Sequence, residues 1–257
     1  MDTRFSCTGC GKCCTDHHVP LTLSEACSWA EDGGQVIVLL EAFLKDGAVL
    51  HNLALSEQQQ THARRRSLPV LCGSAQAYVS VTFAAFNAGR CRNLGADNRC
   101  GIYAQRPLVC RIYPMEINPH IPLRPQAKEC PVEAWETGPA LIHGGHLVDH
   151  QLAELIEQSR QADRDEIAAK ALICSRLGIR TAALKGDGFT TYLPRTADFL
   201  MALHEVQKLE RIDMQKAALD WAFYVQDPDL ARRLEETGAL IAAILANEGM
   251  FISVRAA

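Results

Sequence analysis

Two stretches in the first third of the chain have the hydrophobic pattern of β-strands. Val36–Leu40 is a continuous aliphatic run, and Tyr78–Phe83 alternates so that Val79, Val81 and Phe83 share one side. We expect these stretches to form a small antiparallel sheet. The segment between them, residues 53–69, contains a glutamine run and an arginine triplet, which predicts a solvated helix or loop.

Helical patterns dominate from about residue 136. Asp163 and Glu166 have the spacing of a capping box before an apolar stretch, and Thr196 precedes a predicted helix over 197–210. Asp227-Pro228 predicts the start of a last long helix. Its apolar stripe consists of Leu230, Leu234, Ile241 and Leu245, and the helix is predicted to end at Gly249. Residues 188–193 predict a strand or an extended arm.

Shorter signals occur in the N-terminal half. Ser24 is the predicted N-cap of a two-turn helix that ends at Gly33-Gly34. Arg106-Pro107 predicts a helical turn that ends at Tyr113-Pro114.

These patterns predict an α+β protein that is mostly helical. We expect a loop-rich cysteine-cluster module with a small antiparallel sheet over residues 1–137, carrying an insertion at about 28–88. It is expected to pack on a C-terminal helical region over 138–257, with the boundary near Gly138-Pro139.

Composition narrows the class of protein. The 257 residues are 48% hydrophobic and 22% charged with a net charge of −4, which excludes collagen-like chains and highly charged disordered chains. The Arg64–Arg66 triplet has no interleaved aromatic residues. A zinc-type nucleic-acid-binding module is therefore the weakest of the alternatives, and we do not expect a nucleic-acid partner.

The N-terminus has no signal-peptide pattern, and no apolar run is long enough for a membrane span. We therefore expect a cytoplasmic protein without a membrane partner. In that compartment thiols stay reduced, so clustered cysteines favour metal ligands over disulfides.

Cysteine is the unusual feature of this composition, with 11 residues. Eight of them have recognisable spacings and are the candidate metal ligands: Cys7, Cys10, Cys13, Cys14, Cys91, Cys100, Cys110 and Cys130. The other three, Cys27, Cys72 and Cys174, have no partner at ligand spacing and are predicted core residues.

Eight thiolates could supply two four-thiolate sites, or one site with four spare thiols. Adjacent side chains point in different directions, so Cys13 and Cys14 are expected to serve different sites, or one site through an unusual turn. We expect the metal-free chain to be poorly folded. Without metal, converging thiols stay protonated or repel one another as thiolates, and the loop-rich segment loses the stability that a bound cation or cluster provides.

Other candidate groups lie near the cysteines or beyond them. His17-His18 could ligate zinc, although a solvated loop pair is the preferred interpretation, and the set His143, His146 and His150 is a weaker case for metal. Arg106 and Arg111 flank Cys110, where they could offset thiolate charge or make structural salt bridges.

Residues 5–14, with the run Cys7-x2-Cys10-x2-Cys13-Cys14, resemble the opening of the YkgJ-like CxxCxxCC cysteine-cluster family. A second match spans Cys91 to Pro114, so the resemblance covers roughly residues 5–36 and 88–130. It implies a zinc- or iron-chelating module. The cysteine-rich part of flagellin lysine N-methylases is a more distant similarity, and Cys130-Pro131 resembles the end of ferredoxin-type motifs.

The sequence thus predicts a metal-binding module that chelates an iron–sulfur cluster of the 4Fe–4S type, with zinc as the alternative. The C-x2-C-x2-C run favours the cluster. Redox chemistry or metal handling would be its role, and a protein could be a further partner. The alternative is a cluster-containing, methylase-like enzyme that modifies proteins, for which no catalytic residue or glycine-rich cofactor fingerprint is identified.

Overall fold

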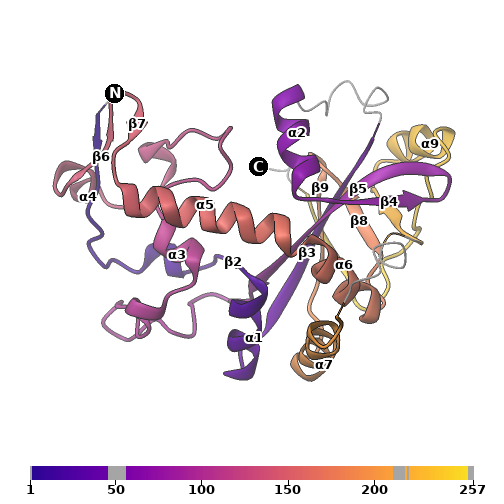
Figure 1. The fold of residues 1–257 in the computed structure, drawn as a ribbon, viewed down its shortest axis with the longest axis horizontal. Helices are drawn as coiled ribbons and strands as arrows, with labels where there is room; N and C mark the ends of the chain where they lie inside the picture. The colour runs from indigo at the N-terminus through magenta and orange to yellow at the C-terminus, as the bar shows by residue number, and fades with distance from the viewer. Residues whose placement is uncertain (1, 46–55, 211–217, 219, 254–257) are drawn as a thin grey trace. The chain divides into compact units, whose positions relative to one another are not determined.

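The computed structural model describes residues 2–45, 56–210, 218 and 220–253 (Figure 1). By their contacts the residues form two units, each described by itself below. The first unit joins Met1–Leu21 to Phe86–Ala162, and the second joins Thr22–Ala85 to Asp163–Ala257. The boundary near Gly138-Pro139 stays a prediction.

The second unit is built on a mixed sheet. Its strands are β3 (Val36–Leu44), β4 (Leu68–Cys72), β5 (Ala75–Ala85), β8 (Thr181–Leu184), β9 (Gly188–Tyr192), β10 (Ala222–Tyr224) and β11 (Met250–Ser253). β3 pairs antiparallel with β5 along its length, as the apolar pattern predicted, and β4 and β5 form a hairpin. β3 also pairs parallel with β8 and antiparallel with β9, while β8 pairs parallel with β10 and β9 antiparallel with β11.

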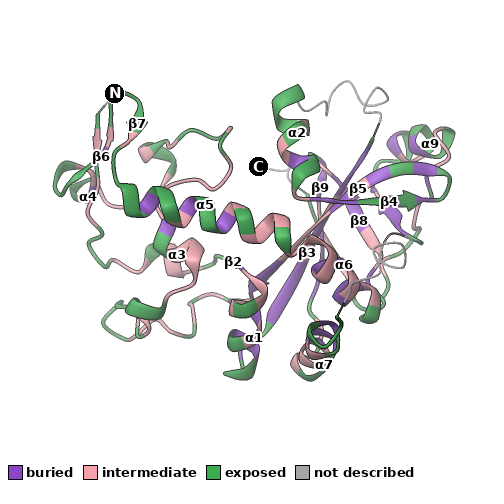
Figure 2. Ribbon diagram, in the orientation of Figure 1, coloured by how far each residue is buried: buried purple, intermediate pink, exposed green. Residues whose placement is uncertain are grey.

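Most of β3 and much of β5 are buried, as Figure 2 shows by colour. The helices of this unit are α1 (Leu23–Glu31), α2 (Glu57–Arg65), α6 (Ile167–Arg176), α7 (Thr196–Gln207) and α9 (Pro228–Glu236). α1 and α6 contact β5, and α7 packs against both helices. Phe83 of β5 and Phe199 of α7 meet edge to face with ring centroids 5.2 Å apart, next to a core that includes the fully buried Trp221.

The prediction that the protein is mostly helical is not confirmed. The described residues are about 35% helix and 25% strand. The expected last long helix is wrong beyond Glu236, because Gly238 takes a left-handed conformation with φ of 83° and ends it. After Gly238 the chain is extended at Ile241, which forms a parallel bridge with Phe223 of β10. An apolar residue can fit either a helix or an extended segment, so spacing alone did not show where the helix ends.

Two helix starts differ from the prediction, and the start of α9 agrees with it. Thr22, not Ser24, is the N-cap of α1, where it forms a capping box with Glu25. The Asp163 capping box is wrong, because α5 continues to Asp165. Asp227 caps α9 as predicted. The polar segment before β4 forms α2, while residues 53–55 of that prediction lie outside the described residues.

The first unit holds the small antiparallel sheet β1 (Thr3–Arg4), β6 (Ala140–His143) and β7 (His146–Leu147). The unit's other elements are β2 (Val19–Leu21), α3 (Leu108–Ile112), α4 (Glu133–Glu136), most of α5 (His150–Asp165), and the short 3-10 turns η1 (Lys12–Cys14), η4 (Tyr103–Gln105) and η5 (Pro125–Ala127). α3 follows Pro107 and ends before Pro114, as predicted. The core of the first unit contains a small apolar cluster centred on Ile112, Leu141, Leu152 and Ile156. The patterned cysteines lie in the loops and short helical turns of this unit.

None of the helices in the described part of the chain is long and apolar enough to cross a membrane.

Candidate metal centre

All eight patterned cysteines lie in the first unit, and the three unpatterned cysteines lie in the second. The patterned residues come from several elements: Cys7 and Cys10 from the loop after β1, Cys13 and Cys14 from η1, Cys91 and Cys100 from a long loop, Cys110 from α3, and Cys130 from the segment before α4. The unpatterned Cys72 and Cys174 are fully buried, as predicted. Cys27 is only partly buried, so its prediction as a core residue is wrong.

Two glycines shape the loop that carries the first four cysteines. Gly9 and Gly11 have φ of 69° and 73°, in the left-handed region that side chains disfavour. A Cβ on Gly11 would also lie only 3.1 Å from the Cβ of Asn98. The loop therefore turns twice between cysteines and approaches the Cys91–Cys100 segment closely because glycine stands at these positions.

A backbone hydrogen bond joins the two cysteine motifs. The N–H of Cys91 donates to the carbonyl oxygen of Cys14 at 2.7 Å. Within the second motif an antiparallel bridge pairs Leu94 with Cys100, which folds that loop back on itself. Residues far apart in sequence are thereby gathered beside η1.

Four thiols are electrostatic neighbours and are called the first set: Cys14, Cys91, Cys100 and Cys110. The pKa of Cys110 is raised to about 12, mainly by burial and in addition by the neighbouring thiols of Cys14, Cys91 and Cys100. Burial also raises the pKa of Cys91, again with contributions from Cys14 and Cys100. These thiols repel one another as thiolates, a conflict that a bound cation removes.

A second neighbourhood is formed by Cys7, Cys10 and Cys130. Burial raises the pKa of Cys130, and the thiols of Cys10 and Cys7 add to that increase. Cys13 lies where the two neighbourhoods meet, because its pKa is raised by Cys14 and Cys110 of the first set and by Cys7 of the second.

Cys13 and Cys14 place their sulfurs 3.9 Å apart. Their hydrogen bond leaves the proton on Cys13 and lowers the pKa of Cys14 to about 6, with help from the charges of Arg106 and His17. Arg106 is held by its Nε, which donates to the carbonyl oxygen of Tyr103, and by stacking on that ring at 3.7 Å. It also lowers the pKa of Cys110, so its position suits the charge-offsetting role considered for it.

Tyr113 supports Cys130 in the second neighbourhood. The two are joined by a hydrogen bond of 3.2 Å between the phenol oxygen and the sulfur. Burial and this bond raise the pKa of Tyr113 well above its usual range, so the phenol keeps its proton and donates a hydrogen bond to the sulfur. Sequence reasoning missed this residue, and its position three residues after Cys110 is the only signal that pointed to it.

The histidines have other partners. His18 stacks on Phe86 and its Nδ1 accepts from the N–H of Asn87. His17 faces Glu129 across 3.7 Å, with both side chains more than half exposed. His143 pairs with Asp2 at the β6–β7 hairpin, which turns through Gly144-Gly145.

In the part of the chain that the structure describes, no three of the patterned thiols have sulfurs that all lie within 4.8 Å of one another. Among the described residues, three donor atoms that all lie within 4.8 Å of one another come from Cys27, Glu31 and His204 of the second unit. The patterned thiols do have the chemistry that zinc and iron require: soft sulfur donors, nearby cations and a protonated phenol as hydrogen-bond donor.

Comparison with known proteins agrees with the resemblance seen in the sequence. Residues 6–131 match the model of the CxxCxxCC family, described as a "putative zinc- or iron-chelating domain". No curated protein and no solved structure matches the chain. The match supports metal binding in general and does not distinguish zinc from iron.

Proposed function

We propose that the first unit chelates metal at two four-thiolate sites. The first set, Cys14, Cys91, Cys100 and Cys110, forms one site, and Cys7, Cys10, Cys13 and Cys130 form the other. The observation that carries this proposal is the meeting of the two cysteine motifs at η1, where the N–H of Cys91 bonds to the carbonyl oxygen of Cys14 and the sulfurs of Cys13 and Cys14 lie 3.9 Å apart. The mutual effects of the thiols on their pKa values support the same grouping. Four thiolates are the usual ligand count both for structural zinc and for a cubane cluster.

An iron–sulfur cluster is the proposed occupant, because three thiols at intervals of three residues wrap a chain around a compact cluster. Zinc is the alternative that the same donor set accepts. The surrounding residues would serve either metal. Arg106 offsets thiolate charge at the first site, and Tyr113 donates a hydrogen bond to a sulfur of the second.

Storage, delivery or redox use of the metal would be the biological role. The bound metal also stabilises the fold in this proposal, because the first unit has a small apolar core for its long cysteine loops.

The experiment compares Cys13→Ser with Cys14→Ser. Each protein is purified without oxygen, and its iron, zinc and acid-labile sulfide are measured per chain. Each single variant should lose one site and keep the other, so the metal content should fall by half, and the double variant should lose both.

Cys72→Ala is the control, since Cys72 is fully buried in the second unit and outside both sets. It should keep the full metal content. Loss of all metal in both single variants would contradict two separate sites, and full retention in both would contradict ligation by either residue. Colourless protein with zinc and no sulfide would overturn the iron–sulfur assignment.

A further inference from the structure

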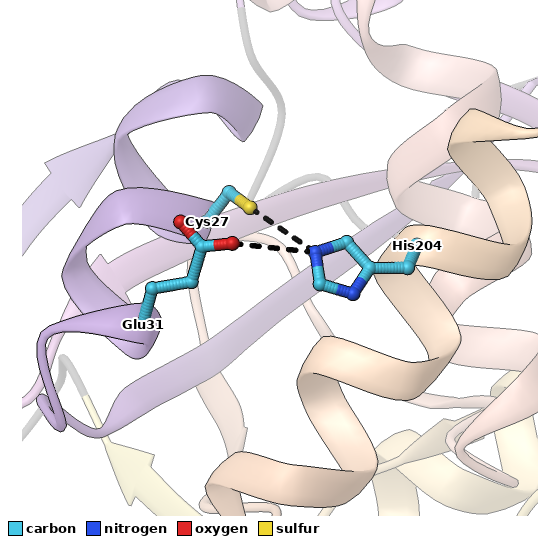
Figure 3. A group of neighbouring side chains, drawn as sticks. All are labelled: Cys27, Glu31 and His204. Atoms are coloured by element: carbon cyan, nitrogen blue, oxygen red, sulfur yellow. Dashed lines mark hydrogen bonds and ion pairs between the residues drawn. The ribbon is translucent and has the colours of Figure 1, made fainter.

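Three side chains of different chemistry converge in the second unit, away from the patterned cysteines in sequence. Cys27 and Glu31 come from α1, and His204 comes from α7. Figure 3 shows the thiol, one carboxylate oxygen and one ring nitrogen directed toward a common point. A thiolate, an imidazole and a carboxylate are the three types of side chain that bind zinc in proteins.

The helices place these groups in register. Cys27 and Glu31 are four residues apart, which puts both on the same face of α1. α7 packs against α1 and carries His204 to that face. Cys27 and His204 are separated by 177 residues in sequence, which is why no local spacing revealed the group.

The distances fit one tetrahedral ion. His204 Nε2 lies 3.6 Å from Cys27 Sγ and 3.5 Å from Glu31 Oε1. With bonds of about 2.3 Å to sulfur and about 2.0 Å to nitrogen or oxygen, tetrahedral zinc holds such donor pairs about 3.3 to 3.6 Å apart. The two distances from His204 therefore match a tetrahedral ion, and the sulfur of Cys27 lies within 4.8 Å of the Glu31 oxygen.

Exposure indicates what kind of site this is. The side chains of His204 and Glu31 are 43% and 54% exposed, and Cys27 is partly buried. Three protein ligands at an accessible position leave the fourth coordination position to water or another small ligand, as in catalytic rather than closed structural zinc sites. A thiolate and a carboxylate also carry two negative charges, which a divalent cation neutralises.

We propose that Cys27, Glu31 and His204 form a zinc site with an open fourth position. It shares no residue with the two four-thiolate sites and does not depend on them. His204 binds through Nε2, Glu31 through one carboxylate oxygen, and Cys27 as the thiolate, so its proton is released to solvent when zinc binds.

The test measures the alkylation rate of Cys27 in the full chain. The protein is used as purified, with the metal that it already holds. The protein is treated with iodoacetamide with and without added Zn²⁺, and alkylation is located by residue-resolved mass spectrometry. Zinc should slow alkylation of Cys27 in the unaltered chain, because a metal-bound thiolate is a poor nucleophile. The protection should be lost in His204→Asn and weakened in Glu31→Gln.

Glu205→Gln is the matched control. Glu205 adjoins His204 on α7, is about as exposed as Glu31, and pairs with Arg176 instead. This variant should keep the protection. Circular dichroism checks that each variant folds, which we expect because the substituted side chains are about half exposed.

A second measurement uses Co²⁺ as a spectroscopic substitute for zinc. Thiolate-to-cobalt charge-transfer bands should appear in the unaltered chain. In Cys27→Ser their intensity should fall by the contribution of one bound cobalt ion per chain. The proposal is overturned if Cys27 is alkylated equally with and without zinc, or if protection survives in His204→Asn. Because the first readout concerns Cys27 alone, failure of the four-thiolate sites would leave its result unchanged.

Discussion

Removing the phenol oxygen of Tyr113 tests the support given to the second four-thiolate site. The Tyr113→Phe substitution deletes the O–H donor that lies 3.2 Å from Cys130 Sγ. The ring can stay where it is, packed edge to face against Phe5 at 6.4 Å and beneath Lys128. The variant therefore isolates a single hydrogen bond to a proposed ligand.

The expected magnitude follows from the nature of the acceptor. A hydrogen bond to a charged group contributes about 1.5 to 3 kcal/mol. Both residues are partly exposed, so the lower part of that range applies. At about 1.4 kcal/mol per factor of ten, metal affinity at the second site should fall about tenfold, within the range of about 10- to 100-fold for partners of ligands.

The assay is competition with a chelator, following metal release from the anaerobically purified protein. Tyr113→Phe should release metal from one site at lower chelator concentration than the unaltered protein, and release from the other site should be unchanged. Tyr103→Phe is the matched control, because Tyr103 is 56% exposed and contacts Arg106 through its ring. Equal retention by Tyr113→Phe and the unaltered protein would refute the argument that this bond supports a ligand.

Two further predictions concern an ion pair and the thiols. Lys170 is 3% exposed and its Nζ lies 3.0 Å from Glu166, so Lys170→Ala should lower the free energy of unfolding by about 3 kcal/mol. Arg232→Ala, which breaks the exposed pair with Asp229, should cost at most about 1 kcal/mol, and equal losses in urea melts would contradict this prediction. In protein from which metal has been removed and which circular dichroism shows to be folded, Cys14 should be alkylated first, with a rate that rises through pH about 6 as the thiolate forms. Cys110, with its pKa raised to about 12, should react among the last. Residue-resolved mass spectrometry across pH checks this order, and faster alkylation of Cys110 than of Cys14 at neutral pH would contradict it.

The sequence predicted features that carry a strong local pattern, and it missed features that depend on weak patterns or distant contacts. The β3–β5 pairing followed from two apolar stretches, and the cap at Asp227 followed from its neighbour Pro228. The strand pairing of β8 with β3 and β10 could not be predicted, because short runs of alanine and threonine do not distinguish strand from helix. Gly238 ended the last helix although the apolar spacing continued beyond it.

The candidate sites also combine residues that sequence spacing identifies with contacts that only the fold reveals. Spacing alone identified eight cysteines that the fold gathers into one unit. Their grouping depends on contacts such as that of Cys91 with Cys14, which no spacing encodes. Tyr113, and the convergence of Cys27 with His204 from helices far apart in sequence, likewise required the fold.

X-ray absorption spectroscopy of the anaerobically purified protein tests the central claim most directly, because it reports the atoms bound to the metal. In the Cys27→Ser variant, which lacks the thiolate of the proposed zinc site of the second unit, the account predicts a first shell of four sulfur atoms per metal at about 2.3 Å at the iron or zinc edge. A first shell of nitrogen and oxygen atoms, or protein free of both metals, would contradict chelation by the cysteine thiolates.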